Sequence, residues 1–460
     1  MRREIAKKCA QVRESGVKGT RGIVSTVLIS ACILAQVWPT AGAVTEKPEI
    51  HVSKGEICEV CGMYIELFRK TASEVVFENG HREHFCGVVC ALRRINEYLG
   101  MPHVKSAYVT DWNTQQAMPL KEACLVIGSD IIPDMIPNLI AFQTEAAAET
   151  YRKTHGGRHI KLEEALASIS YYGLTVPFRI TPAATPPARV LTIGVVGSRM
   201  VSDKTLRGNT RVSADDVLKN RAMVPAKMEG NAATIAAGYA LTDDLSLQLG
   251  MPYLWKSMKS QTRTGEKSFY EEGPGDIATD LRYRFYHDEK FDQHLAALLR
   301  VSIPSGYFSD ANRSRPTMQL GTGMLGTGGG LLFSQHLGLF WLHASLEYFY
   351  PFENRFDYRF GEQSKGGFAV HFTPSTKTML GLEFDYTIVA KNQDNNKAVF
   401  NTGRETATGN MVLEQRLAYF WGGNLNFRGL FGLPIYEHVE DIQLGESYHF
   451  AGAFQWKRRF

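Results

Sequence analysis

The sequence predicts a small α+β domain followed by a transmembrane antiparallel β-barrel of about 12 strands. Three observations lead to this fold class. The chain has 460 residues, which is too long for one ordinary hydrophobic core. A Pro-rich stretch at 180–188, "ITPAATPPA", separates two parts of different texture. Beyond it, apolar and polar residues alternate with a period of two in one segment after another.

Residues 1–43 have the pattern of an export signal. A basic leader is followed by the apolar stretch 22–38, and Ala41 and Ala43 form the small-x-small pattern of a signal peptidase site. We therefore expect the mature chain to begin near Val44. Two alternatives stay open. "ISAC", which ends at Cys32, resembles a bacterial lipobox and would place a lipid there, and a single-pass anchor is disfavoured by the shortness of the apolar stretch.

Residues 44–179 are expected to form the α+β domain. β-branched and aromatic residues on both sides of Asn79-Gly80 predict a hairpin. Apolar residues at helical spacing predict a helix in 86–99, and "EACLVIGS" (122–129) predicts a buried strand. A second helix is expected to begin at Thr144 and to end at Gly156. The prolines of 180–188 exclude both a helix and ladder pairing, so this stretch is interpreted as a linker.

Residues 189–460 are expected to form the barrel. In the segment 382–388, "LEFDYTI", every second residue is apolar or aromatic and the residues between them are polar or charged. Two different environments must therefore flank each strand. A soluble sandwich would satisfy this pattern with its charged side in water, whereas a barrel would turn its apolar side to lipid and its charged side to the lumen.

The candidate strands and loops favour the barrel. About twelve strands of roughly ten to sixteen residues can be counted, which suits a bilayer crossing by tilted strands. Short turns alternate with long polar loops, which are expected at 202–230, 258–274 and 305–318. The chain ends in Phe460 after alternating aromatic residues, a pattern that resembles the signal read by outer-membrane barrel assembly machinery.

Charge and motifs exclude other classes of protein. The formal net charge is only +4 and the basic residues are scattered, which argues against a nucleic-acid partner. We find no nucleophile elbow, phosphate loop or HExxH motif, so we do not expect an enzyme.

The cysteines of the first domain indicate chemistry. Five of the seven cysteines follow the signal segment, and "CEVCGM" (58–63) brings Cys58, Cys61 and Met63 together. Copper(I) prefers such soft sulfur ligands. Zinc is the alternative cofactor, because Cys86, Cys90 or His84 could complete a set of four ligands. A redox pair is a third possibility, although no helix is expected after Cys61.

Residues 50–170 resemble the NosL family of nitrous oxide reductase copper accessory proteins. The resemblance rests on "CEVCGM" (58–63), "YVTDW" (108–112), "IGSDIIPDM" (127–135) and "AAETYRKTHGG" (147–157). It implies a periplasmic copper(I) site with Cys61 and Met63 as ligands, Met135 as a third sulfur and Cys58 in support. This chain departs from the family in "HFCGVVC" (84–90), which adds Cys86 and Cys90 at positions i and i+4, suited to a second metal grip or a disulfide.

The second part resembles the outer-membrane family named after the meta-pathway of phenol degradation, mainly through "GPGDIATDLRYRF" (273–285). That resemblance implies a twelve-stranded, channel-like barrel and fixes no substrate.

Together these observations predict an outer-membrane metallochaperone with its copper-binding domain in the periplasm. It would capture copper(I), or hand it over to a periplasmic copper protein, by exchange of sulfur ligands. The alternative is a passive outer-membrane channel for small or hydrophobic solutes that carries a structural zinc or redox cysteine module.

Overall fold

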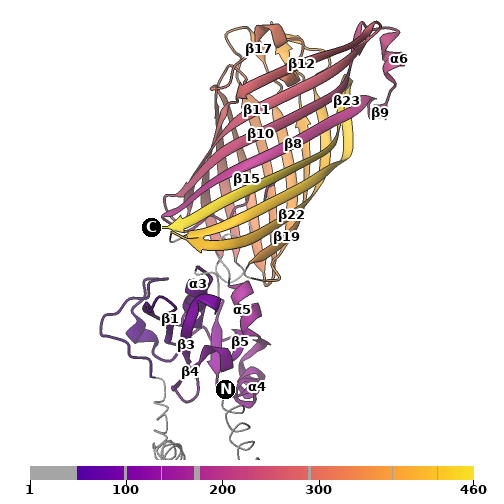
Figure 1. The fold of residues 1–460 in the computed structure, drawn as a ribbon. Coiled ribbons are helices and arrows are strands. Elements are labelled where there is room, and N and C mark those ends of the chain that lie inside the picture. The colour runs from indigo at the N-terminus through magenta and orange to yellow at the C-terminus, as the bar shows by residue number, and fades with distance from the viewer. Residues whose placement is uncertain are drawn as a thin grey trace, which may run out of the picture. The chain divides into compact units, whose positions relative to one another are not determined.

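The computed structural model describes residues 49–97, 101–135, 137–169, 177–288, 292–375, 377–421 and 423–460. The expected export signal and Cys32 lie outside the described residues. Within the described ranges, no helix is both long and apolar enough to span a membrane. The fold consists of an α+β domain and a closed antiparallel barrel, as the sequence predicts (Figure 1).

The α+β domain contains two small antiparallel sheets. The first has the strand order β2-β1-β3-β4 and the second has the order β6-β5-β7. The strands are β1 (Ser73–Phe77), β2 (Arg82–Phe85), β3 (Val104–Thr110), β4 (Ala117–Pro119), β5 (Cys124–Ser129), β6 (Leu139–Phe142) and β7 (Gly156–Ile160). The helices are α3 (Val88–Glu97), α4 (Glu145–His155) and α5 (Leu162–Ser168), with short 3₁₀ turns at Ile65–Phe68, Met101–His103 and Leu120–Glu122.

Local sequence accounts for these elements. Gly80 has φ +83°, so it supplies the left-handed position that reverses the chain between β1 and β2. Thr144 caps α4, because its side chain accepts a hydrogen bond from the backbone N–H of Ala147. The helix ends at Gly156, which has φ +69°.

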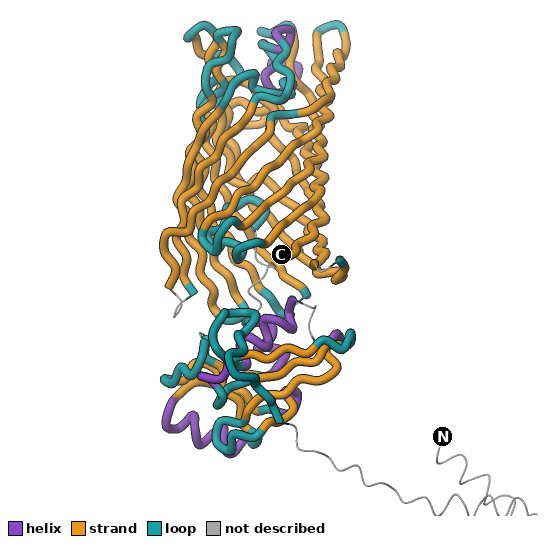
Figure 2. Tube along the Cα trace, turned by 90° about the vertical axis from the view of Figure 1, so that its left-hand side faces the viewer, coloured by secondary structure: helices purple, strands orange, loops and turns teal. Residues whose placement is uncertain are grey.

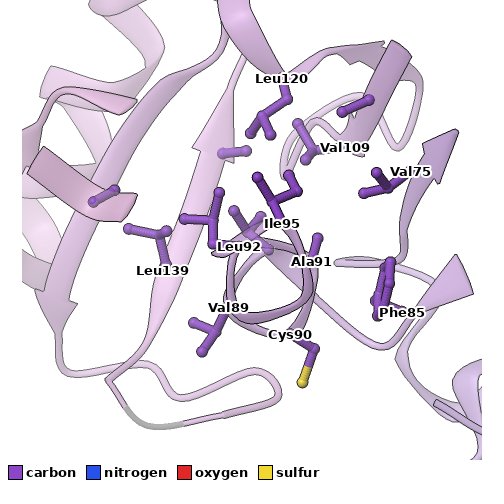
Figure 3. Close-up of a cluster of buried hydrophobic side chains, with 14 of the residues drawn as sticks. Val75, Phe85, Val89, Cys90, Ala91, Leu92, Ile95, Val109, Leu120 and Leu139 are labelled. Atoms are coloured by element: carbon purple, nitrogen blue, oxygen red, sulfur yellow. The ribbon is translucent and has the colours of Figure 1, made fainter. Parts of the chain in front are cut away.

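The hydrophobic core of the α+β domain forms around α3. Leu92 and Ile95 are fully buried and face residues of both sheets (Figure 3). Cys90 lies at one end of this cluster, where its sulfur points away from Leu92 and Ile95 (Figure 3). The core thus holds the first turn of α3, and the cysteine in that turn, in a fixed position.

The barrel is a ring of long strands. In ring order, the described strands are β8 (Val190–Gly208), β10 (Met223–Ala240), β11 (Leu245–Thr262), β13 (Ile277–Asp288), β14 (Gln293–Ile303), β15 (Gly326–Leu337), β16 (Phe340–Pro351), β18 (Gln363–Phe372), β19 (Thr378–Val389), β22 (Arg404–Phe420) and β23 (Gly423–Arg459). All neighbours are antiparallel, and β8 pairs with both β10 and β23, which closes the ring (Figure 2).

The closed ring contains twelve crossings. Eleven described strands are named in it, but an odd number cannot close with every pair antiparallel. The number becomes even because the 37-residue β23 crosses the wall twice: Gly423–Val439 pairs with β22, and Val439–Arg459 pairs with β8. The rings of Phe427 and Phe454, one from each arm, lie 5.4 Å apart. β23 is therefore a hairpin that turns near Asp441, where φ is +63°.

The barrel wall is apolar outside and charged inside. In β19, Leu382 is 52% exposed, whereas the neighbouring Glu383 is fully buried. In β13, Tyr283 is 54% exposed and Arg284 is 6% exposed. The period-two pattern predicted this division, and the ring assigns the charged face to the lumen.

The longer connections differ partly from the expected loops. Residues 258–274 are not a loop, because β11 continues to Thr262 and pairs with β12 (Gly265–Pro274). Residues 305–318 contain two 3₁₀ turns, Asp310–Asn312 and Pro316–Met318. The loop expected at 202–230 is shorter than predicted, because β8 continues to Gly208 and β10 begins at Met223. The connection between them carries β9 (Thr210–Arg211) and α6 (Ala214–Leu218). The two-residue strands β17 (Tyr358–Arg359), β20 (Gln393–Asp394) and β21 (Lys397–Ala398) form a separate small sheet.

The Pro-rich stretch follows the inner wall of the ring. It has no helix or strand, as its prolines require. Just before it, the backbone N–H groups of Phe178 and Arg179 donate to the carboxylate of Glu383 at 2.8 and 2.7 Å. Within it, the N–H of Ala183 donates to Ser334 Oγ at 2.9 Å. Luminal side chains thus satisfy backbone groups that a ladder would otherwise pair.

Candidate metal centre

The first pair of cysteines lies in a tight turn. The backbone N–H of Cys58 donates to the carbonyl of Met63 at 2.8 Å, and the N–H of Gly62 donates back to the carbonyl of Cys58 at 2.8 Å. Gly62 has φ +76°, a conformation that residues with a Cβ rarely adopt. The turn therefore directs Cys58 and Cys61 toward the same space.

The second pair of cysteines opens α3. Cys86 precedes the helix and Cys90 lies in its first turn. Thr71 Oγ1 donates to the carbonyl of Cys86 at 2.8 Å, which fixes the chain before the helix. Unpaired N–H groups and the helix dipole favour negative charge at this end. The helix that redox chemistry would need is thus absent after Cys61 but present at Cys86–Cys90.

All four sulfurs share one small volume. The Sγ atoms of Cys58, Cys61, Cys86 and Cys90 all lie within 4.8 Å of one another. Cys61 Sγ is 3.4 Å from Cys86 Sγ, and Cys86 Sγ is 3.6 Å from Cys90 Sγ. Four thiolates around a tetrahedral ion would be separated by about 3.8 Å, given metal–sulfur bonds of about 2.3 Å. None of the five described cysteines forms a disulfide.

Hydrogen bonds among the four thiols shift their pKa values in different directions. Hydrogen bonds from Cys61, Cys86 and Cys90 hold the pKa of Cys58 below its ordinary value. Hydrogen bonds to Cys58 in turn raise the pKa of Cys86 and of Cys90. The hydrogen bond with Cys58 raises the pKa of Cys61, but those with Cys86 and Cys90 lower it, and the net result lies below the ordinary value. Cys58 and Cys61 therefore release protons more readily than Cys86 and Cys90, which keep theirs. An incoming soft metal ion would displace those protons as it binds.

The carboxyl group of Asp134 lies against Gly87, the residue that follows Cys86. A Cβ atom added to Gly87 would stand 1.3 Å from Asp134 Oδ2, so glycine is required here to admit the carboxyl group. Burial raises the pKa of Asp134 to about 7. Asp134 was not among the predicted site residues, although it directly precedes Met135 in the "PDM" turn.

The structure places the other candidate ligands differently. Met63 and Met135 are partly buried and pack against the hydrophobic cluster that contains Cys58, Cys86 and Cys90. His84 Nδ1 is 2.6 Å from Glu56 Oε1, and its Nε2 is 3.0 Å from Glu74 Oε2. Because carboxylates occupy both ring nitrogens, His84 does not contribute a ligand to the cluster in this arrangement. It ties β2 to the preceding turn.

The four-cysteine arrangement was only partly accessible to sequence reasoning. The spacing of Cys58 and Cys61 and that of Cys86 and Cys90 suggested two separate pairs. The two pairs meet because β1 and β2 bring the start of α3 back to the turn at Gly62. That convergence depends on tertiary packing, which local spacing does not encode.

Comparisons with known proteins bear on each part of the chain. Residues 49–169 match the family model described as NosL, which confirms the predicted resemblance of this segment. The solved copper chaperone NosL from Shewanella denitrificans is 22% identical, with 25% of this chain and 93% of that chain covered and a TM-score of 0.24. The comparison with curated proteins gives no match.

Two solved barrels are similar to the second part. An outer membrane channel from Pseudomonas putida F1 is 16% identical, with a TM-score of 0.47 and coverage of 60% of this chain and 98% of that chain. A FadL homologue from Pseudomonas aeruginosa is 9% identical, with a TM-score of 0.32 and coverage of 63% and 96%.

The raised pKa of Asp134 makes stability depend on pH. The folded chain holds the Asp134 proton between about pH 4 and pH 7, whereas the unfolded chain releases it. The associated stability is fully present below pH 4 and is lost as the pH rises toward 7. We expect the metal-free, reduced fragment 44–179 to lose on the order of 1 kcal/mol per pH unit in this window. Urea unfolding at pH 5 and pH 7 measures the loss.

Asp134→Asn should remove this pH dependence and should stabilise the fragment at pH 7. Glu122→Gln is the control, because Glu122 is an exposed carboxylate outside the cysteine cluster. Equal pH slopes in the wild-type and Asp134→Asn fragments would contradict the assignment.

Proposed function

We propose that this protein is an outer-membrane barrel whose NosL-like domain captures copper(I) in the periplasm and exchanges it with a partner protein. The observation that carries the proposal is the convergence of four cysteine sulfurs within 4.8 Å of one another. The match of residues 49–169 to the NosL family supports copper as the metal.

Sulfur chemistry explains the preference for copper(I). Thiolate and thioether ligands select soft ions, and the cluster offers four thiols with Met63 and Met135 packed against the same core. Copper(I) is satisfied by two or three sulfurs, so four thiols leave at least one in reserve. That reserve permits the ion to move from one sulfur to another without leaving the site.

The handover proceeds by ligand exchange alone. Cys61 is partly exposed, whereas Cys58, Cys86 and Cys90 are buried. A thiolate of a partner protein would therefore attack the ion on the Cys61 side. One copper–sulfur bond forms as another breaks, and the released thiolate recovers a proton. The oxidation state of copper does not change, and no enzymatic step is involved.

The barrel supplies the membrane location. Its outer surface carries apolar side chains and its inner surface carries charges, which is the reverse of a soluble protein. Bacterial barrels have short periplasmic turns and longer extracellular loops. The turn between β15 and β16 and the turn between β18 and β19 are short and lie at the end of the ring where β8 begins. The domain that precedes β8 is therefore expected in the periplasm.

A passive channel with a structural zinc module is the second candidate. The sulfur spacings of 3.4 and 3.6 Å also suit four thiolates around zinc. In this case the cysteines would stabilise the fold, and the barrel alone would act on solutes. The two candidates differ in metal preference and in the role of Cys61.

Copper titrations test the first candidate. We expect the reduced full-length protein to bind copper(I) more tightly than zinc when each competes with a chelator of known affinity. Cys58→Ser and Cys86→Ser should each weaken copper(I) binding at least about tenfold, because they remove buried ligands. Cys124→Ser is the control, since Cys124 packs against a different cluster. If zinc binds tightly and neither the zinc affinity nor the copper(I) affinity falls in the cysteine variants, the cluster holds neither metal.

A transfer assay separates a carrier from a structural zinc module. Cys61→Ser should slow copper(I) transfer to a competing thiol ligand more than it weakens binding at equilibrium, because Cys61 is the exposed ligand on the side from which that thiol reaches the ion. If Met63→Ala leaves copper affinity unchanged and zinc binds more tightly than copper(I), the zinc module is the better explanation.

An outward charge tests the membrane location. Leu346 lies in β16, is 69% exposed and pairs in register with Leu331 on β15. We expect Leu346→Arg to destabilise the folded barrel in lipid vesicles by about 2–4 kcal/mol. Phe340→Arg, at the start of β16, should cost only about 0–1 kcal/mol, because it lies near the membrane interface. Urea titrations of vesicle-inserted protein measure both, and equal costs would argue against a lipid-facing wall.

A further inference from the structure

A second group of potential ligands lies in the barrel, at the turn between β13 and β14. His287, Asp292 and His294 each offer one ligand atom, and these atoms all lie within 4.8 Å of one another. None of the three belongs to the α+β domain or to the cysteine cluster. Sequence reasoning did not find them, because they contain no recognisable motif.

Asp292 is the centre of this group. Its Oδ1 lies 3.0 Å from His294 Nε2 and 3.6 Å from His287 Nε2. The rings of His287 and His294 are stacked, with centroids 4.4 Å apart and an interplanar angle of 11°. The two nitrogens thus face the same carboxylate from neighbouring positions on paired strands, where His287 is the register partner of His294.

A neighbouring turn holds Asp292 in place. His336 Nδ1 lies 3.0 Å from Asp292 Oδ2, and the backbone N–H of His336 donates to the Asp292 carbonyl at 3.1 Å. Asp292 itself has φ +46°, a left-handed conformation that aspartate and asparagine tolerate better than most residues. Backbone strain of this kind gathers where a side chain must point in a set direction.

The positive charge next to this group is already neutralised, so it does not oppose the binding of a cation. Among the described residues, Arg284 brings a positive charge to this group, with Nη1 at 3.3 Å from His294 Nδ1. Its charge is already paired, because its Nε and Nη2 each lie 2.7 Å from Asp244 Oδ1. The ring of Trp341 stacks on His336, with centroids 4.5 Å apart, and covers the group on that side.

We propose that His287, Asp292 and His294 form a second metal site, which binds a divalent ion of borderline softness such as Zn²⁺ or Cu²⁺. Two imidazoles and one carboxylate are the ligands that such ions prefer, whereas the cysteine cluster offers only sulfur. His336 is a positioning residue, since it binds the other carboxylate oxygen and does not need to touch the ion.

The ion enters from the exposed side of His287. The His287 side chain is 26% exposed, whereas that of His294 is fully buried. Binding at Nε2 requires His294 to carry its proton on Nδ1, so Arg284 must turn away from that nitrogen. Asp244 already holds two other nitrogens of Arg284, which allows this movement without an unpaired buried charge.

Zinc is the probe that tests the second site. Full-length reduced protein in detergent is dialysed against buffered Zn²⁺, and bound zinc is counted per chain and examined by X-ray absorption. We expect one zinc with nitrogen and oxygen ligands in addition to any zinc on sulfur. His287→Gln and Asp292→Asn should each weaken the nitrogen and oxygen site at least about tenfold, and His336→Gln should weaken it by about tenfold.

Two controls keep the outcome clear. Asparagine adopts the left-handed conformation of Asp292 readily, so Asp292→Asn retains the turn. His438→Gln changes a histidine near the opposite end of the ring, next to the turn of β23, and should leave zinc binding unchanged. Heat-modified migration in detergent gels confirms that each variant barrel is folded.

The possible results separate this site from the cysteine cluster. Loss of the zinc on nitrogen and oxygen in His287→Gln, with zinc on sulfur retained, supports the proposal. The absence of any such zinc in the wild-type protein overturns it, as does unchanged binding in both ligand variants. Failure of the cysteine cluster would instead remove sulfur from the spectrum and leave the second site intact.

Discussion

The sharing of one buried volume by four cysteine sulfurs is the constraint on which the functional interpretation depends. Thiols at this separation cannot all ionise without a cation among them, because like charges repel strongly where water is excluded. The turn at Gly62 and the start of α3 hold the sulfurs together in spite of this cost. A fold that positions four ionisable sulfurs so closely gains stability once a positive ion joins them.

In the barrel the usual pattern of burial is reversed, because charged side chains lie inside and the apolar outer surface suits lipid rather than water. Charged side chains such as Glu383 and Arg284 are buried, and leucine and aromatic side chains are exposed. Some of these charges pair between nearby strands of the wall: Arg300 lies 2.7 Å from Asp280 on the adjacent strand and 2.8 Å from Glu347 on β16. The α+β domain buries apolar side chains and the barrel buries charged ones, but each has to provide partners for the polar groups that it removes from water.

Periodicity carried most of the fold prediction. Alternation in segments such as 382–388 indicated both the strands and the two faces, and Asn79-Gly80, Thr144 and Gly156 marked where elements turn, begin and end. The prediction of a loop at 258–274 was wrong because β11 and β12 extend their ladder beyond the short barrel crossing. Polar composition alone does not distinguish an exposed hairpin from a loop.

The sites were less accessible than the fold. The motif at 58–63 identified Cys58 and Cys61, but the joining of the two cysteine pairs, the place of Asp134 over Gly87 and the engagement of His84 by two glutamates depend on distant segments. The group around Asp292 had no local pattern at all. It is assembled by strand register between β13 and β14 and by a turn that reaches it from β15.

The pairing of β8 with β23 determines how late in folding the barrel can close. Ring closure joins residues 190–208 to 439–459, near opposite ends of the barrel sequence, whereas the cysteine cluster joins residues only 32 positions apart. Contacts between distant segments form slowly, because a long loop must close first. The α+β domain is therefore expected to bring its four sulfurs together while the barrel is still an open sheet, so the two parts of the chain fold in a set order.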